Sequence, residues 1–164
     1  MMLQPTDLDV AARLAMAVAC GGVIGIERDL RNMPTGFRTL ALVCLGSCVA
    51  IIAAIKAGDT DGFSRIAQGL VTGIGFLGGG VILQGKAMAE VKGLTTAAAI
   101  WFVAAVGLLC GLGELKLAGM ATFAAVLVLA GDMFKKRAPE VDKASAASEA
   151  AKPAATAEKP TEPR

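Results

Sequence analysis

Five apolar stretches, separated by short polar segments, fill the first 137 residues of the chain. Each stretch is close to the roughly 20 apolar residues that a helix needs to cross a bilayer. Thr6 and Asp9 form the pattern of a capping box at the start of the first stretch. The pattern predicts an all-α integral membrane protein, a bundle of five transmembrane helices at residues 8–26, 37–56, 66–83, 94–112 and 117–134.

The third stretch is unusually rich in glycine. In water each glycine costs a helix about 1 kcal/mol relative to alanine. In hydrocarbon the helix keeps its own hydrogen bonds, and small residues allow neighbouring helices to approach closely. At 100° per residue these glycines fall on two opposite sides, which predicts a central glycine-rich helix with neighbours on both faces. The expected packing positions are Gly69, Gly73, Gly75, Gly78, Gly79 and Gly80.

Small residues also mark two other stretches. Ala17, Gly21 and Gly25 lie four residues apart in the first one, and we expect this stripe to meet the central glycine helix. Gly93 precedes the fourth stretch and completes the set of predicted packing glycines. The two threonines that follow, at positions 95 and 96, can cap the first turn of that helix.

Basic residues are divided unequally between the two sides that five spans define. Arg28, Arg31, Arg38, Lys86, Lys92, Lys135, Lys136 and Arg137 fall on one side, and Arg13, Lys56, Arg65 and Lys116 on the other. The positive-inside rule therefore predicts an outside N-terminus and a cytoplasmic C-terminus. Arg13 is expected to reach the near interface with its long side chain, and Arg31, Lys86 and Lys92 are expected to be interfacial anchors.

The C-terminal segment, residues 138–164, differs in composition from the rest. Val141 is its only large aliphatic residue, and alanine, lysine, glutamate, proline, serine and threonine make up the remainder. Such a segment cannot form a core, so we expect a disordered cytoplasmic tail.

Composition excludes several functions. The formal net charge of +2 is small and dispersed, which argues against nucleic acid as a partner. Histidine and tyrosine are absent, so the usual general base and the commonest transition-metal ligand are missing. No catalytic residue, metal site or cofactor is predicted. Four cysteines lie in apolar stretches without a C-x-x-C pair and are expected to pack as small hydrophobic residues: Cys20, Cys44, Cys48 and Cys110.

Two soluble-protein motifs match by accident. The run from Gly73 to Gly78 fits G-x-G-x-x-G, but no acidic residue stands near Ala98, where a dinucleotide site would need one. The run from Gly80 to Lys86 nearly fits a P-loop, but Ala87 stands where serine or threonine must hold magnesium. Neither motif carries a functional prediction.

The predicted topology gathers polar residues at the cytoplasmic end of the bundle. Glu27, Arg28 and Arg38 directly adjoin apolar spans, and opposite charges on neighbouring helices can pair where the dielectric constant is low. Two interpretations stay open, a structural ion-paired cluster and a site that also binds a ligand. The predicted cluster consists of Glu27, Arg28, Arg38, Thr39, Thr95 and Thr96.

Three blocks of the chain resemble the signature blocks of the MgtC/SapB family of bacterial inner-membrane proteins: GGVIGIERDLRNMPTGFRTLALVCLG, RIAQGLVTGIGFLGGGVIL and VKGLTTAAAIWFVAAVGLLCGLG. The resemblance covers about residues 8–129. The family pattern marks Gly25, Glu27, Arg28, Gly36, Arg38 and Thr39, then Gly73, Gly75, Phe76, Gly78 and Gly80, then Gly93, Leu94, Thr95, Thr96 and Ala97.

The resemblance implies a five-helix membrane domain associated with magnesium homeostasis, growth at limiting magnesium and acid tolerance. In several pathogens, members of the family are also associated with survival inside host cells. Members look like regulators of other membrane machinery, with the F-type ATP synthase as one suggested target. Longer members continue into a folded cytoplasmic domain, so this chain resembles a short form, which weakens any expectation of a specific virulence role.

Two main hypotheses follow. The first is a non-enzymatic regulator that contacts a membrane partner through its small-residue faces, which also favour homo-oligomers. The second is a transporter or channel for magnesium or another cation, although no carboxylate lies near the middle of a predicted span. Asp59 and Asp61, in an outer loop, could hold magnesium through water. An intramembrane enzyme is a third reading and lacks any recognisable pair of nucleophile and base.

Overall fold

The computed structural model describes residues 6–58, 60–83 and 93–135. Within these residues the regular structure consists of the helices α1 (Asp7–Leu30), α2 (Phe37–Ala57), α3 (Thr60–Leu83), α4 (Leu94–Leu112) and α5 (Leu115–Lys135). The predicted all-α membrane fold with five helices is confirmed. Length and composition mark four of them as membrane spans, whereas α5 contributes a shorter apolar segment, Leu115–Gly131.

The chain divides into two compact units, Met1–Leu129 and Ala130–Arg164. All contacts described below lie within the first unit. The predicted disordered tail at residues 138–164 lies outside the described residues.

Two helices are longer than their apolar stretches predict. α1 continues past Ile26 for a further turn and ends at Leu30. There the Arg31 N–H donates to the Arg28 carbonyl, the Asn32 N–H donates to the Asp29 carbonyl, and Asn32 turns left-handed at φ 54°. α3 begins at Thr60, within the expected polar loop. Polar residues do not break a helix by themselves, whereas left-handed residues do, so Gly58 at φ 70° ends α2 instead.

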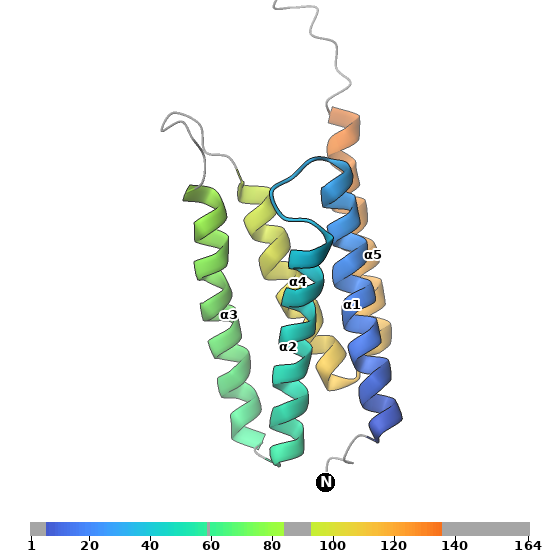
Figure 1. Ribbon diagram of the computed structural model, residues 1–164, viewed down its shortest axis with the longest axis vertical. Coiled ribbons are helices and arrows are strands. Elements are labelled where there is room, and N and C mark those ends of the chain that lie inside the picture. Colours follow the sequence, from blue (N-terminus) through green and yellow to red (C-terminus); the bar gives the residue numbers. More distant parts are fainter. Residues whose placement is uncertain (1–5, 59, 84–92, 136–164) are drawn as a thin grey trace, which may run out of the picture. The chain divides into compact units, whose positions relative to one another are not determined.

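Successive helices run in alternating directions, as Figure 1 shows. α2 packs against α1, α3 and α4, and α4 packs against α1, α2 and α3. The middle of the first unit is therefore formed by α2 and α4. Among the described residues α3 contacts α2 and α4 alone.

The position of α3 differs from the prediction. The glycine-rich helix was expected at the centre, but within this chain it lies at an edge of the bundle (Figure 1). Only 11% of the residues in its most apolar segment are buried inside the protein, compared with 44% for α2 and 50% for α4. The two-sided glycine pattern predicts two packing surfaces, but it cannot tell whether the second surface belongs to the same chain.

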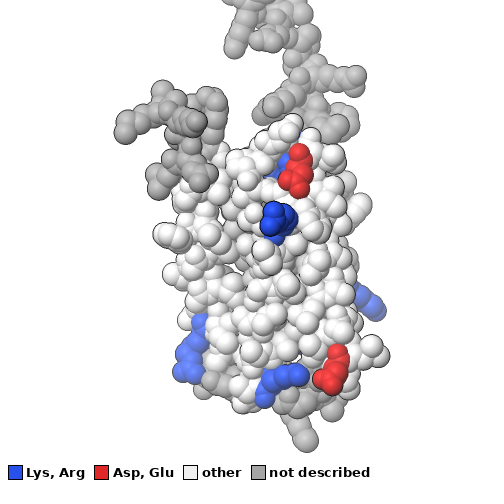
Figure 2. All heavy atoms as spheres, viewed as in Figure 1, with Lys and Arg blue, Asp and Glu red and all other residues white. Residues whose placement is uncertain are grey.

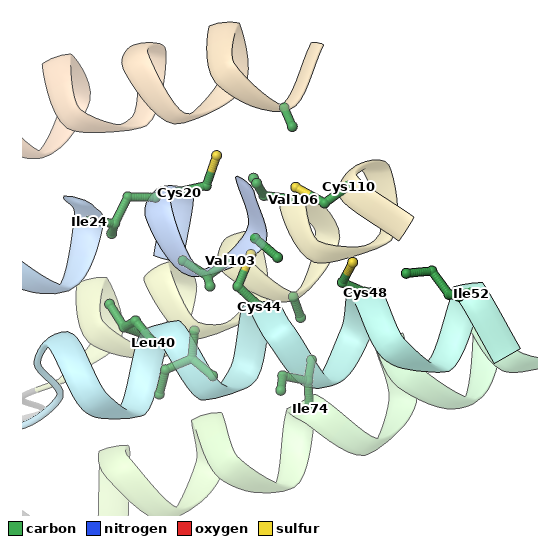
Figure 3. Packing of buried hydrophobic residues seen from close by; sticks show 14 residues of the cluster. Cys20, Ile24, Leu40, Cys44, Cys48, Ile52, Ile74, Val103, Val106 and Cys110 are labelled. Carbon is green, nitrogen blue, oxygen red and sulfur yellow. The ribbon is translucent and has the colours of Figure 1, made fainter. Parts of the chain in front are cut away.

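Four free thiols lie in the shared core of α1, α2 and α4. Figure 3 shows them among aliphatic side chains that include Leu40, Val103 and Val106. All four are buried and unbridged, which confirms the expectation that they pack as small hydrophobic residues: Cys20, Cys44, Cys48 and Cys110.

The closest helix contacts are made at glycines. A Cβ atom at Gly21 would lie 2.6 Å from the Leu40 carbonyl oxygen, and one at Gly25 would lie 2.5 Å from the Cα atom of Phe37. The small-residue stripe of α1 therefore meets α2, and the prediction that it meets the glycine-rich helix is wrong. A periodic stripe identifies a face but not its neighbour.

A second glycine pair joins α4 to α2. A Cβ atom at Gly107 would collide with the Cys44 carbonyl oxygen, and one at Gly111 would lie 2.7 Å from the Cβ atom of Ile51. The spacing Gly107-x-x-x-Gly111 is the signal by which this contact could have been predicted.

Candidate functional site

Arg28 and Thr96 form a buried tie between α1 and α4. Arg28 is 3% exposed and Thr96 is 1% exposed. The Arg28 Nη2 atom donates a hydrogen bond of 2.9 Å to the Thr96 hydroxyl oxygen. A buried guanidinium group is costly unless it is bonded, so this contact links the end of α1 to the first turn of α4. The structure thus brings together two residues of the predicted cluster.

Glu27 pairs within its own helix. Its carboxylate forms an ion pair with the guanidinium group of Arg31, one turn further along α1, and the two side chains are 13% and 21% exposed. Glu27 thus pairs with the residue that caps the end of its own helix; pairing across neighbouring helices and the interfacial anchor role of Arg31 stay predictions. Residues at i and i+4 lie on the same side of a helix, which brings these two side chains together.

The remaining cluster residues are exposed and separate from this tie. Arg38 and Thr39 lie in the first turn of α2 and border a shallow depression with Leu42 and Val43. Thr95 lines a different hollow, a groove between α4 and α5. The six predicted residues therefore share one end of the bundle, and their action as one functional cluster stays a prediction.

Asp29 was not predicted as a functional or structural residue. Its Oδ2 atom accepts a hydrogen bond of 2.8 Å from the backbone N–H of Phe37, the first residue of α2. A Cβ atom at Gly36 would collide with the same carboxylate. Asp29 thus caps α2 from the preceding helix and fixes the α1–α2 turn. The available signal was an acidic residue shortly before a Pro-Thr-Gly turn.

Arg13 ties helices together at the opposite end. Its Nη1 atom donates a hydrogen bond of 2.7 Å to the Gly111 carbonyl oxygen, and its Nη2 atom lies 2.9 Å from Asp9 Oδ2. The Arg13 side chain is 12% exposed because it packs against α4 near the end of that helix, and its reach to the membrane interface stays a prediction. The side chain occupies the C-terminal end of α4, where free carbonyl groups and the helix dipole favour a cation.

The predicted packing glycines of α3, together with Gly93 at the start of α4, fall into two groups. A Cβ atom at Gly78 would contact the Cβ of Ala97 at 3.5 Å, and Gly93, at φ 94°, lies against the Val81 carbonyl. These two predicted positions hold α3 on α4. The other five have no described atom within 4 Å of an added Cβ. At 100° per residue they spread over an arc of roughly 160° on the side of α3 away from Gly78. We call them the glycine face: Gly69, Gly73, Gly75, Gly79 and Gly80.

Other side chains beside the glycine face are also exposed. Phe76 is 85% exposed. Gln68 and Thr72 are exposed too, and the Thr72 hydroxyl donates to the Gln68 carbonyl oxygen at 2.9 Å. Exposed glycines of this kind are typical of helix–helix interfaces in membranes.

Among the described residues no group of three or more histidine, cysteine or acidic side chains could hold a metal ion. Asp59 lies outside the described residues, and so does the side chain of Asp61. The alternative that these two aspartates hold magnesium through water, which belongs to the transporter hypothesis, is therefore not tested by the described residues.

The surface has the charge distribution of a membrane protein. On the face shown in Figure 2, most charged side chains lie toward the two ends, and mainly uncharged atoms cover the region between them. Together with four apolar helices of spanning length, this surface defines a multi-pass helical membrane protein surrounded by a lipid bilayer.

Comparison with known proteins gives the family. Residues 14–137 match the MgtC family. Protein SrpB of Synechococcus elongatus is 40% identical over 136 residues, which cover 76% of this chain and 75% of that protein. Protein MgtC of Salmonella typhimurium strain LT2 is 38% identical over 152 residues, or 93% of this chain. The chain belongs to the MgtC family, and the predicted resemblance is confirmed.

The coverage of these relatives is uneven. The chain spans 62% of the length of the Salmonella typhimurium MgtC protein. Protein MgtC of Brucella abortus is 44% identical over 113 residues, which cover 68% of this chain and 46% of that protein. No solved structure matches the chain.

Proposed function

We propose that this protein is a non-enzymatic regulator of the bacterial inner membrane, linked to magnesium homeostasis and to adaptation to low magnesium or acid stress. It acts by contacting another membrane protein. Membership of the MgtC family supports the link to magnesium. The observation that carries the proposed mode of action is the glycine face of α3.

The glycine face suits a transmembrane partner for a physical reason. Lipid tails are as apolar as leucine side chains, so helices in a bilayer associate through close packing and polar contacts. Small residues permit such an approach, and here five glycines have free space in front of them. The exposed Gln68 amide offers a hydrogen bond in a place where lipid offers none.

The partner is a membrane protein with a helix that can lie against α3. The F-type ATP synthase is the candidate that the family resemblance suggests, and a second copy of this chain is the other. In the proposed topology the N-terminus is outside and the C-terminus is cytoplasmic. The Arg28–Thr96 tie and the exposed Arg38 then lie at the cytoplasmic end.

The proposal is tested by cross-linking in cells grown at limiting magnesium, with a photoreactive residue at Phe76. We expect the wild-type chain to capture a membrane protein. Gly73→Leu should abolish both this capture and growth, because its side chain blocks the approach. Ala15→Leu is the matched control, since Ala15 is exposed on α1, which does not contact α3. Equal capture and growth in all three proteins would refute the proposal.

Transport is tested separately by magnesium flux into liposomes that contain the purified protein. We expect flux at the level of empty liposomes, because no described carboxylate lies midway along a spanning helix. Flux above that level, abolished by Arg38→Ala, would replace regulation with a magnesium or cation channel.

A further inference from the structure

An apolar groove of about 340 Å³ lies between α4 and α5 in the half of the bundle where α4 begins. The two helices leave a tight turn at Gly113 and draw apart toward that half (Figure 1). Uncharged side chains line the groove, and Ile24 of α1 is buried at its base. The residues that define its two walls are Thr95, Ala98 and Phe102 on α4 and Ala121, Ala125 and Val128 on α5.

The groove exists because α5 presents small side chains where it faces α4. Ala121, Ala124 and Ala125 follow the i, i+3, i+4 spacing of one helix face. Elsewhere in the bundle small residues bring two backbones together, as Gly107 does with α2. Here the helices diverge, so the small side chains leave space that no described side chain fills.

The dimensions of the groove select its occupant. Thr95 and Phe102 are two turns apart on α4, a rise of about 10 Å, so the volume corresponds to a cross-section of about 30 Å². A helix with its side chains is 10–12 Å wide, which is too wide to enter a space of this cross-section. Water has almost no polar partner in the groove and does not fill an apolar space. One extended hydrocarbon chain fits.

The single polar group of the groove fixes the direction of that chain. Thr95 lies in the first turn of α4, at the end nearest the polar surface of the bundle, and its side chain is exposed. A phospholipid whose acyl chain runs along α4 would bring its ester oxygens to this level, within reach of the hydroxyl group. The opposite end of the groove, at Phe102 and Ala121, is apolar.

We propose that this groove is a specific binding site for one acyl chain of a phospholipid from the leaflet in which α4 begins, with the lipid ester group beside Thr95. Transfer of a lipid tail from the bilayer into the groove gains no hydrophobic free energy. Binding instead comes from dispersion contacts with the groove walls, which an unfilled space would forfeit.

The experiment uses the whole protein in vesicles of phosphatidylethanolamine and phosphatidylglycerol, with a trace phospholipid that carries a diazirine in the middle of one acyl chain. After irradiation, mass spectrometry locates the labelled residues. We expect labelling to concentrate on the groove walls. Ala125→Leu should lower that labelling severalfold, because the added side chain occupies the groove. Ala19→Leu, at an exposed position of α1 outside the groove, should not change it.

Three results would overturn the proposal. Labelling spread evenly over all exposed side chains would show ordinary surrounding lipid and no site. Equal groove labelling in wild type and Ala125→Leu would place the chain elsewhere. Capture of a protein by a photoreactive residue at Ala98 in native membranes would assign the groove to a partner helix. If Ala125→Leu does not fold, Ala98→Leu fills the same groove from the opposite wall. If neither variant folds, the distribution of labelled residues in the wild-type protein decides the test.

Discussion

Several charged residues of the described helices bind a specific polar partner, and the sequence predicted these partners only in part. The sequence places Arg28 and Thr96 at the same end of the bundle, because Arg28 follows the first apolar stretch and Thr96 lies at the start of the fourth. It does not show that α1 and α4 are neighbours, so the contact between them had to come from the structure. Glu27 and Arg13 show the same limit, since each binds a group that sequence position alone did not single out.

The tie between Arg28 and Thr96 predicts a specific loss of stability. Thr96→Val keeps the shape but removes the acceptor, which leaves a buried guanidinium group with one bond fewer and should cost about 1–3 kcal/mol of unfolding free energy. Denaturant unfolding in micelles measures this. Thr39→Val is the matched control, because Thr39 is exposed. Equal losses in the two variants would show that the tie is not formed.

Arg38 and Arg31 should separate function from structure. Arg38 is exposed on α2, so Arg38→Ala should reduce growth at limiting magnesium without lowering the amount of protein in the membrane. Arg31→Ala removes a partly exposed i,i+4 ion pair, whose loss costs less than about 1 kcal/mol, and growth should be unchanged. Growth assays with immunoblots of membranes test both. Identical growth defects would point to general loop charge.

At the scale of the element, glycine does two different things in this chain. Gly21, Gly25, Gly107 and Gly111 bring α1, α2 and α4 into close contact, whereas the glycine face of α3 meets no atom of the described residues within 4 Å of an added Cβ. The five helices were predictable because hydrophobic length is a local property. The role of each glycine was not, because it depends on which helix lies opposite.

Two glycine substitutions should therefore have opposite effects. Gly107→Ala places a methyl group against the α2 backbone and should destabilise the protein by about 1–3 kcal/mol. Gly46→Ala meets no atom within 4 Å in the middle of α2 and should be neutral or stabilising by up to about 1 kcal/mol. Unfolding of both variants under the same conditions gives the comparison. Similar losses in the two would contradict the observed crossing of α2 and α4.

At the scale of the whole molecule, the centre formed by α2 and α4 was not predictable from composition. Both helices are apolar on nearly every side, but the exposed glycine-rich helix is apolar too. Burial inside the protein and exposure to lipid select the same residue types, so hydropathy cannot rank the helices from centre to edge. The small-residue contacts of α2 with two neighbours settle its position.

The proposed topology gives a labelling prediction. In a cysteine-free variant, Lys116→Cys lies in the first turn of α5, beside the α4–α5 turn, and Asn32→Cys lies between α1 and α2. A membrane-impermeant thiol reagent should label Lys116→Cys from the periplasmic side and leave Asn32→Cys unlabelled until the inner membrane is opened. The reverse pattern would place the N-terminus in the cytoplasm.

The order of the helices along the chain differs from their order in space, and this has a consequence for biogenesis. α2 finds its first close neighbour, α1, as soon as the hairpin capped by Asp29 is complete. Its second close neighbour, α4, leaves the ribosome only after α3. During synthesis α3 must therefore enter the bilayer before its main docking helix exists and must leave the flank of α2 open. Before α4 is made, α3 contacts only α2 among the described helices. It can therefore move aside for α4 without disturbing the contact between α1 and α2.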